Sequence, residues 1–356
     1  MSDTILPAVL AWCRPGFESE TAQELAALAE RHDAAGYART ERGCGYVEFV
    51  AGSPAAADRI VERTPWRTLC FPRQLLRATA RIEALPPRDR IGALLPAIVA
   101  TGRRFADVWV EAADSDAGRE LAPLCRALNA ALVGALRREN LLERDAADRL
   151  HIGFVRSDAA FVAHARVALA APWPGGIPRL RFPSAAPSRS TLKLEEAFLT
   201  LLDDGERERW LRAGMSAVDL GAAPGGWTYQ LVRRSIRVTA IDNGPMAPSL
   251  METGLVTHQR EDGFRYRPPR PVDWLVCDMV EQPRRVAARM AEWLAGGWCR
   301  YAIFNLKLPM KKRHEEVRLC LDLLAERCAS AGRRLDLRSR QLYHDREEVT
   351  VFARCA

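Results

Sequence analysis

The chain contains very little lysine. Of its 52 basic side chains only Lys193, Lys307, Lys311 and Lys312 are lysines, and arginine fills every other basic position. Arginine stays charged at any relevant pH, whereas a lysine ammonium can lose its proton where its surroundings disfavour charge. We therefore expect lysine to persist where deprotonation or a compact ammonium matters. Lys307 follows an apolar run, and Lys193 begins a predicted helix, so neither is an ordinary surface position.

Other absences exclude whole classes of protein. None of the nine cysteines forms a C-x-x-C pair and the six histidines show no metal-ligand spacing, which predicts reduced thiols and no metal site. No stretch approaches the roughly 18 consecutive apolar residues of a membrane helix. Met1 to Trp12 lack the basic start and apolar run of a secretion signal. These absences predict a soluble, cytoplasmic protein with no membrane partner.

The composition favours a multidomain protein with a polyanionic partner. The 356 residues suit two or three domains, and 48% hydrophobic residues are enough to bury real cores. The formal net charge of +7 favours a partner such as nucleic acid, although charge says nothing about fold.

A proline-rich segment, residues 172 to 193, marks the main domain boundary. It holds five prolines, two adjacent glycines and no acid, a composition that resists both helix and sheet interior. The pattern before it predicts an α+β region with sheets covered on one face. Strands are predicted at 8–12, 46–50, 108–112 and 161–167, and helices at 18–31 and 121–142.

Beyond this segment, strand and helix patterns alternate. Strands are predicted at 217–221, 238–242, 272–278 and 301–307, with helices at 227–235, 286–294 and 315–331. Such alternation predicts an α/β fold with a doubly wound, mostly parallel sheet. Residues 334–343 and 349–354, joined by a short polar connection, predict an antiparallel hairpin that ends the sheet.

A glycine-rich turn follows the first of these strands. Residues 218 to 227 carry the spacing G-x-x-P-G-G, which differs from the G-x-G-x-x-G of dinucleotide sites. Asp242 closes the next strand, where a carboxylate can accept both hydroxyls of a ribose, and Asp262 lies where the third strand would end. A bare strand-helix connection would need neither acid. The combination therefore favours S-adenosylmethionine, whose amino-acid part takes the place of phosphates.

Four charged residues from distant segments are predicted to converge. Asp278 and Lys307 end adjacent strands, Glu348 begins the antiparallel one, and Lys193 precedes the first strand on a helix. Ligands of open parallel sheets bind outside the carboxyl ends of the strands, where these side chains would meet. Plainer alternatives exist: Lys307 as a strand-end cation, Lys193 paired with Glu196 on a solvated helix, Asp278 as a helix cap, and Glu348 as hairpin charge.

The motifs at these positions carry a family resemblance. They lie at 188–196, 219–227, 276–279, 305–307 and 346–349. Together they resemble the FtsJ-type ribose 2′-O-methyltransferases, with their Lys-Asp-Lys-Glu tetrad. Over its whole length the chain is similar to the branch that methylates a cytidine of bacterial 23S ribosomal RNA, most closely beyond residue 178.

The resemblance implies both architecture and site. It implies a ferredoxin-like subdomain at 1–70, a THUMP RNA-binding domain at 71–171, a linker at 172–189 and a Rossmann-like, S-adenosylmethionine-dependent class I methyltransferase domain at 190–356. Lys307 would accept the proton, with Lys193, Asp278 and a glutamate completing the tetrad; we take Glu348 rather than Glu347, because Glu348 directly precedes the strand valine. The implied cofactor contacts are Ser188, Gly221, Ala223, Pro224, Gly225, Gly226, Asp242, Asp262 and Asp278. Ala223 stands where some relatives carry cysteine, a change expected to have no effect because the position offers mainly backbone.

The implied partner is 23S ribosomal RNA, which the protein would bind as a monomer before assembly of the ribosomal subunit is complete. Lys311, Lys312 and Arg313, next to the proposed site, suit phosphates. Trp173, Tyr343 and His344 are candidates for base stacking. Arg73, Arg77 and Arg81, spaced by four, would share one face of a strand, where a solvated face explains them more readily than RNA does.

The protonation of Lys307 stays open at this stage. A second ammonium about 4 Å away, at an effective dielectric constant near 20, repels by roughly 4 kcal/mol, or about three pKa units. Lys193 and the sulfonium of the cofactor would therefore lower the pKa of Lys307, and Asp278 opposes them.

Two rival functions remain. The first is a THUMP-bearing RNA base methyltransferase. Enzymes of this kind that methylate exocyclic base nitrogens use an Asn/Asp-Pro-Pro-aromatic turn, and this chain has Asp-Met-Val-Glu at 278–281 instead. Methylation of a pyrimidine carbon would need a cysteine nucleophile; Cys277 is adjacent but is expected in the core. The second rival is a non-catalytic RNA-binding or assembly factor that keeps the fold, against which an intact tetrad argues.

Overall fold

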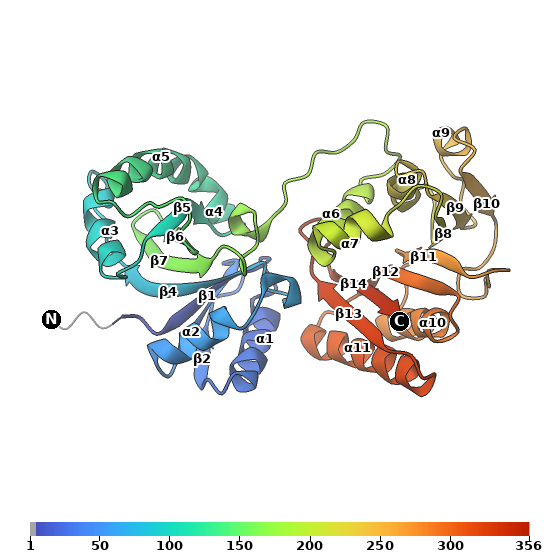
Figure 1. Cartoon of the computed structure of the whole chain (residues 1–356), viewed down its shortest axis with the longest axis horizontal. Helices are drawn as coiled ribbons and strands as arrows, with labels where there is room; N and C mark the ends of the chain where they lie inside the picture. Colours follow the sequence, from blue (N-terminus) through green and yellow to red (C-terminus); the bar gives the residue numbers. More distant parts are fainter. Residues whose placement is uncertain (1–4, 356) are drawn as a thin grey trace. The chain divides into compact units, whose positions relative to one another are not determined.

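The computed structural model describes residues 5–355, which form two compact units divided between Ile177 and Pro178 (Figure 1). Each unit contains one seven-stranded sheet.

The N-terminal unit begins with a β-α-β-β-α-β arrangement. Its elements are β1 (Ala8–Trp12), α1 (Glu18–Arg31), β2 (Gly36–Arg39), β3 (Tyr46–Ala51), α2 (Pro54–Glu62) and β4 (Gln74–Ile82), with a 3₁₀ turn η1 at Trp66–Thr68. The strands pair antiparallel in the order β2-β3-β1-β4. β4 is long enough to pair with β1 near its start and with β7 near its end, so one sheet continues into the second half of the unit.

That second half completes the sheet in the order β4-β7-β6-β5. Its elements are α3 (Arg90–Val99), β5 (Phe105–Ala112), α4 (Asp116–Glu120), α5 (Ala122–Arg138), β6 (Asp148–Arg156), β7 (Ala159–Arg166) and the 3₁₀ turn η2 (Pro174–Gly176). β5 and β6 are parallel, whereas β6 and β7 form an antiparallel hairpin.

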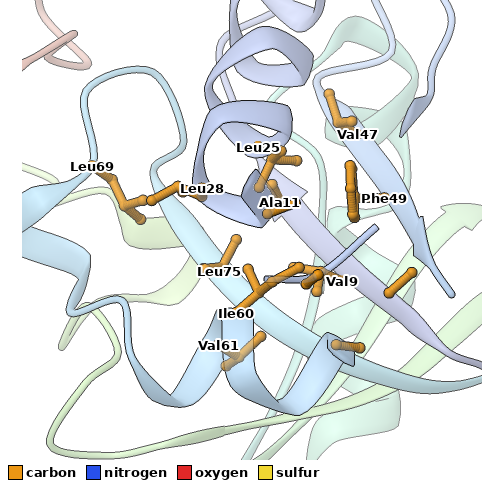
Figure 2. Close-up of a cluster of buried hydrophobic side chains, with 14 of the residues drawn as sticks. Val9, Ala11, Leu25, Leu28, Val47, Phe49, Ile60, Val61, Leu69 and Leu75 are labelled. Atoms are coloured by element: carbon orange, nitrogen blue, oxygen red, sulfur yellow. The ribbon is translucent and has the colours of Figure 1, made fainter. Parts of the chain in front are cut away.

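The core of the first half shows why β1 is apolar throughout. Leu25 and Leu28 of α1 and Ile60 of α2 pack over Val9 and Ala11, which lie on one face of the strand (Figure 2). The alternate residues of β1 belong to a second buried cluster, and all five residues of the strand are buried. The expectation of a sheet covered on one face is therefore wrong for β1, because side chains of β4 and β7 pack with its other face.

The C-terminal unit confirms the predicted doubly wound α/β fold. Its elements are α6 (Thr191–Leu201), α7 (Asp204–Trp210), β8 (Ser216–Leu220), α8 (Gly226–Val232), β9 (Arg237–Ile241), α9 (Pro248–Met251), β10 (Val256–Gln259), β11 (Val272–Cys277), α10 (Pro283–Ala295), β12 (Cys299–Lys307), α11 (Arg313–Ser330), β13 (Leu335–Arg340) and β14 (Glu348–Cys355). The strand order is β10-β9-β8-β11-β12-β14-β13. Strands β8 to β12 pair in parallel, and β14 runs antiparallel between β12 and β13, so the predicted hairpin is confirmed with β13 at the sheet edge.

Helices cover both faces of this sheet, with α6, α7 and α8 on one side and α10 and α11 on the other (Figure 1). One face is filled by aromatic rings: Trp274 and Tyr301 lie 4.9 Å apart between centroids, and Trp210 stacks on Tyr301 at 5.0 Å. With both faces buried, the polar side chains of the inner strands gather at the carboxyl edge, where ligands of such sheets bind.

Candidate active site

The turn after β8 depends on glycine at three positions. Gly221 and Gly225 have φ angles of +77° and +115°, a left-handed region that side chains rarely adopt. A Cβ at Gly226 would lie 2.1 Å from the Ser190 hydroxyl oxygen and 3.2 Å from Cβ of Ser188. The segment before α6 therefore lies directly against the start of α8, and it brings Ser188 next to the turn.

Two carboxylates follow the next strands. Asp242, after β9, accepts backbone N–H groups of Ala223 at 3.0 Å and Gly244 at 2.7 Å, one on each oxygen. Asp262, after β10, accepts the N–H of Phe264 at 2.9 Å and keeps half of its side chain exposed. These two hydrogen bonds hold the Asp242 carboxylate in place. Because each carboxylate oxygen has two lone pairs, Asp242 can still accept hydrogen bonds from ligand hydroxyl groups.

A buried acid lies beneath the turn. Asp219 of β8 is 1% exposed and accepts the hydroxyl of Thr228 at 2.6 Å. Burial, helped by the nearby Asp278 carboxylate, raises the pKa of Asp219 to about 7. Asp219 thus links β8 to the first turn of α8, and its buried position disfavours the ionised form of its carboxyl group.

The four residues predicted to converge lie in one cluster of alternating charge. Asp278 follows β11 and binds Lys307 Nζ through Oδ1 at 2.8 Å and Lys193 Nζ through Oδ2 at 3.4 Å. Glu348 also bridges both lysines, one with each oxygen. Lys307 and Glu348 are opposite each other in the β12–β14 register, while Lys193 reaches the cluster from α6. Each ammonium therefore contacts both carboxylates.

The cluster is partly open. The side chains of Lys193, Asp278 and Lys307 are 16%, 17% and 23% exposed, whereas that of Glu348 is 6% exposed. Its neighbour Glu347 lies just before β14; its side chain is 64% exposed and pairs with Arg313 at 3.3 Å. The contacts of Glu348 with both lysines thus place Glu348, and not Glu347, in the cluster.

The balance of charge around Lys307 favours the ammonium form. Burial lowers the pKa of Lys307, but its contacts with Asp278 and Glu348 together outweigh burial and raise that pKa above the usual value. These contacts therefore favour the ammonium form of Lys307 at neutral pH.

The plainer alternatives for two of these residues are wrong. Glu196 does not pair with Lys193; it accepts the backbone N–H groups of Tyr343 at 2.8 Å and His344 at 3.0 Å, and the His344 ring at 2.6 Å. Asp278 caps no helix, because the residue before α10 is Gln282.

The sequence analysis did not identify the buried polar residues that hydrogen-bond to the cluster. Asn305 of β12 is fully buried and donates to Asp278 Oδ1 at 2.8 Å. Thr350 of β14 and Asp345, both buried, continue this network. A polar Asn305 within an otherwise apolar, buried strand was the available signal.

Three side chains that were considered as RNA contacts serve the packing of the protein instead. Arg73 and Arg77 are 2% exposed and pair with Asp114 at 3.1 Å and Asp58 at 2.7 Å, so neither lies on a solvated face. Trp173 packs edge-on against Trp66, with 5.5 Å between ring centroids.

Two further predicted base-stacking residues are engaged by neighbours. Tyr343 has the Arg179 guanidinium over its ring at 5.5 Å, and the His344 ring binds Glu196. Lys311 and Lys312 are exposed, the latter 3.3 Å from Glu315.

The cysteine next to Asp278 is poorly suited to act as a nucleophile. Cys277 is fully buried, and burial raises the pKa of its thiol to about 12, which disfavours a thiolate nucleophile. Among residues 5–355 no group of three or more His, Cys, Asp or Glu side chains is arranged to hold a metal ion. No helix in the same range is long and apolar enough to span a bilayer.

The residues at this edge fit S-adenosylmethionine. The glycine turn allows a ligand to approach the backbone closely, Asp242 offers anchored acceptors suited to ribose hydroxyls, and Asp262 is an accessible acceptor at the next strand end. None of these features requires a phosphate-bearing ligand.

Comparisons with known proteins agree with this chemistry. Residues 186–323 match the FtsJ-like methyltransferase model, residues 6–76 the RlmM ferredoxin-like domain, and residues 89–166 the N-terminal model of ribosomal RNA large subunit methyltransferase M. Proteins named ribosomal RNA large subunit methyltransferase M from Xanthomonas axonopodis pv. citri and Xanthomonas oryzae pv. oryzae are each 52% identical over 351 residues, covering 98% of this chain and 99% of the relative. TrmN from Thermus thermophilus aligns over 98% of this chain and 99% of its own at 17% identity, with a TM-score of 0.36 that is too low to bear on fold or function.

The matches confirm the resemblance to FtsJ-type methyltransferases and, with it, an enzyme that uses S-adenosylmethionine. The chain belongs to the family of ribosomal RNA large subunit methyltransferase M.

Proposed function

We propose that this enzyme methylates the ribose 2′-hydroxyl of a cytidine in 23S ribosomal RNA, acting as a monomer before subunit assembly is complete. The observation that carries the proposal is the cluster of Lys193, Asp278, Lys307 and Glu348, partly open to solvent at the strand edge that also bears the glycine turn. The names of the relatives support ribosomal RNA of the large subunit as the substrate.

The cofactor is held by the turn and the acids that follow the strands. We assign its contacts to Ser188, Gly221, Ala223, Pro224, Gly225, Gly226, Asp242, Asp262 and Asp278. When bound, S-adenosylmethionine supplies an electrophilic methyl group and a positive charge.

Lys307 acts as the general base in this proposal. A ribose hydroxyl is a weak nucleophile until a base takes its proton, and such a base contributes about 10²–10⁴ in rate. Asp278 and Glu348 fix Nζ in place, and Lys193 contacts the same two carboxylates. Lys193 shares both carboxylates with Lys307, so their negative charge is partly neutralised. The positive charge of S-adenosylmethionine would lower the pKa of Lys307 further, towards the neutral amine that a general base requires.

RNA contacts extend on both sides of the cluster. Lys311, Lys312 and Arg313 follow β12 and are assigned to phosphates flanking the target ribose. Val280 and Met310 follow the adjacent strands β11 and β12 and are 88% and 92% exposed, so we assign them to apolar contact with the target base or its neighbours. Such exposure of large apolar side chains beside a site is typical of a surface that binds a partner.

We assign RNA binding and catalysis to different parts of the protein. We assign RNA binding to residues 1–70, as a ferredoxin-like subdomain, and 71–171, as a THUMP domain; 172–189 form the linker, and 190–356 perform the chemistry. We assign buried Arg73, just before β4, and buried Arg77 of β4 to folding and not to RNA affinity.

A nucleoside analysis tests the reaction. Ribosomal RNA from a strain lacking the gene is incubated with the purified enzyme and labelled S-adenosylmethionine, and is then digested to nucleosides. Label in 2′-O-methylcytidine supports the proposal. Label in a base-methylated nucleoside, or none at all, would favour one of the two rivals, and mapping the mark on 23S ribosomal RNA identifies the nucleotide.

A further inference from the structure

A chain of buried polar side chains approaches Asp278 from behind the cluster. Asn305 and Thr350 face each other across the β12–β14 register, and both are fully buried. Asn305 Nδ2 lies 2.8 Å from Asp278 Oδ1, and Asn305 Oδ1 lies 2.7 Å from Thr350 Oγ1. Only the NH₂ end of an amide can face a carboxylate favourably, so this contact fixes the amide with its oxygen towards Thr350.

The protons of this chain can be counted. A 2.7 Å contact between Asn305 Oδ1 and Thr350 Oγ1 needs a hydrogen, and only the threonine hydroxyl can supply it. Thr350 Oγ1 also lies 3.1 Å and 3.3 Å from the two Asp345 oxygens. Because the single hydroxyl proton is already used, the proton for this second contact has to come from Asp345.

The surroundings of Asp345 suit a neutral acid. Asp345 is 1% exposed and accepts the N–H of Leu342 at 2.9 Å. Among residues 5–355 it has no ion-pair partner. Burial, with Glu348 of β14 and Glu196 of α6 adding repulsion, raises its pKa well above the usual value, opposed by Lys193 and by the Leu342 N–H. A buried, unpaired carboxyl group avoids a large desolvation cost by staying protonated.

We propose that Asp345 is a protonated positioning residue, the first donor of a chain that runs from Asp345 through Thr350 and Asn305 to Asp278. Every hydrogen bond in the chain points towards Asp278, so the chain orients that carboxylate and stabilises its charge without placing another cation in the site. Asp278 in turn positions Lys307 Nζ. This inference rests on the proposed role of the cluster, but the protonation of Asp345 can be measured without any activity.

Paired substitutions test the chain. Thr350→Val keeps the shape and removes the hydroxyl, so kcat should fall at least about tenfold, the cost of one lost buried hydrogen bond. The KM for RNA and the affinity for S-adenosylmethionine should stay within about twofold, because neither Thr350 nor Asp345 is among the residues assigned to RNA or the cofactor. Thr350→Ser and Asp345→Asn keep the donors in place and should retain kcat within about threefold. Equal kcat for Thr350→Val and wild type, or an Asp345→Asn loss as large as that of Thr350→Val, would overturn the proposal.

Carbon NMR gives the direct readout. With ¹³C-labelled aspartate carboxyl groups, the signal that disappears in Asp345→Asn should have the shift of a carboxylic acid at pH 7. An Asp345 signal that titrates near the ordinary value of about 3.9 would refute the protonated donor. The two proposals can fail separately. If the wild-type enzyme methylated no ribose but Asp345 gave the signal of an acid, the proposed function would fail and the hydrogen-bond chain would stand. The same acid signal supports the chain if Thr350→Val does not fold.

Discussion

Arg77 of the N-terminal unit and Lys307 of the C-terminal unit both lie on strands, but their partners differ in kind. The Arg77 side chain is 3% exposed and binds the Asp58 carboxylate at 2.7 Å and the carbonyls of Leu6 and Ala8 at 2.7 and 3.3 Å. Lys307 is 23% exposed and contacts two carboxylates that it shares with a second lysine.

The difference shows how the two cations are used. The fixed donors of a guanidinium satisfy several acceptors at once, which suits a permanent link between β4 and the start of the chain. Lys307 has a proton that it can give up and open space beside it. Arg77 is thus a buried structural cation, whereas Lys307 is a partly exposed cation that the proposed reaction can use.

Separating the units is expected to have the largest effect. Deleting residues 1 to 170 should abolish methylation of full-length ribosomal RNA while S-adenosylmethionine binding stays measurable, because residues 178–356 form a compact unit that contains the glycine turn and the acids. Calorimetry and a methyl-transfer assay measure the two properties. If the isolated unit modified ribosomal RNA at the full-length rate, the division of labour would be refuted.

Lys307→Arg exchanges one kind of cation for the other. A guanidinium keeps charge but cannot release its proton, so single-turnover methylation should fall by at least about 10², or about 2.7 kcal/mol. Cofactor and RNA affinities should change by no more than a few fold. Lys311→Arg is the matched control and should keep its rate, since a phosphate contact needs only charge. Wild-type activity in Lys307→Arg would leave Lys307 a positioning role alone.

Arg77→Met tests the structural side of the comparison. It removes the Asp58 pair and the bonds to two carbonyls, and should lower the free energy of unfolding by about 2–3 kcal/mol, less than for a fully buried pair because Asp58 is 40% exposed. Arg81→Met, four residues along the same strand and 31% exposed, should cost about 1 kcal/mol or less. Denaturant titration measures both; equal losses would contradict the distinction.

Asp242→Ala probes the cofactor edge. Losing an anchored, charged acceptor should weaken S-adenosylmethionine binding by about 1–3 kcal/mol in calorimetry. The thermal midpoint of the free protein is the control for folding. Unchanged affinity in a folded variant would remove Asp242 from the site.

The pH dependence of the rate tests the lysine base without any substitution. The raised pKa of Lys307 leaves the ammonium dominant at neutral pH, so the neutral base is the minor form. The single-turnover rate should therefore rise with pH, by about tenfold per unit, until the apparent pKa of the base in the complex is reached. A rate that is flat from neutral to alkaline pH would argue against a lysine base.

Secondary structure was predictable where each element carried its own pattern. The apolar strands of the C-terminal unit and the helices between them were recognised because both faces of each strand are buried, which makes them continuous apolar runs. The strand that carries Arg77 and Arg81 was expected, but the burial of Arg77 in β4 was not, because the Asp58 carboxylate that accommodates it lies on another element.

By itself the sequence determined the family, the glycine turn, the acids that follow the strands and the lysines that a reaction would need, since all of these are local patterns. Only the tertiary structure decided that Arg73 and Arg77 are buried, that Asp345, Thr350 and Asn305 form one chain, and that the carboxylates outweigh burial at Lys307. The physical reason is that hydrogen bonds and Coulomb interactions depend on distances between atoms of different elements, and the β12–β14 register that sets these distances arises only when the sheet has formed.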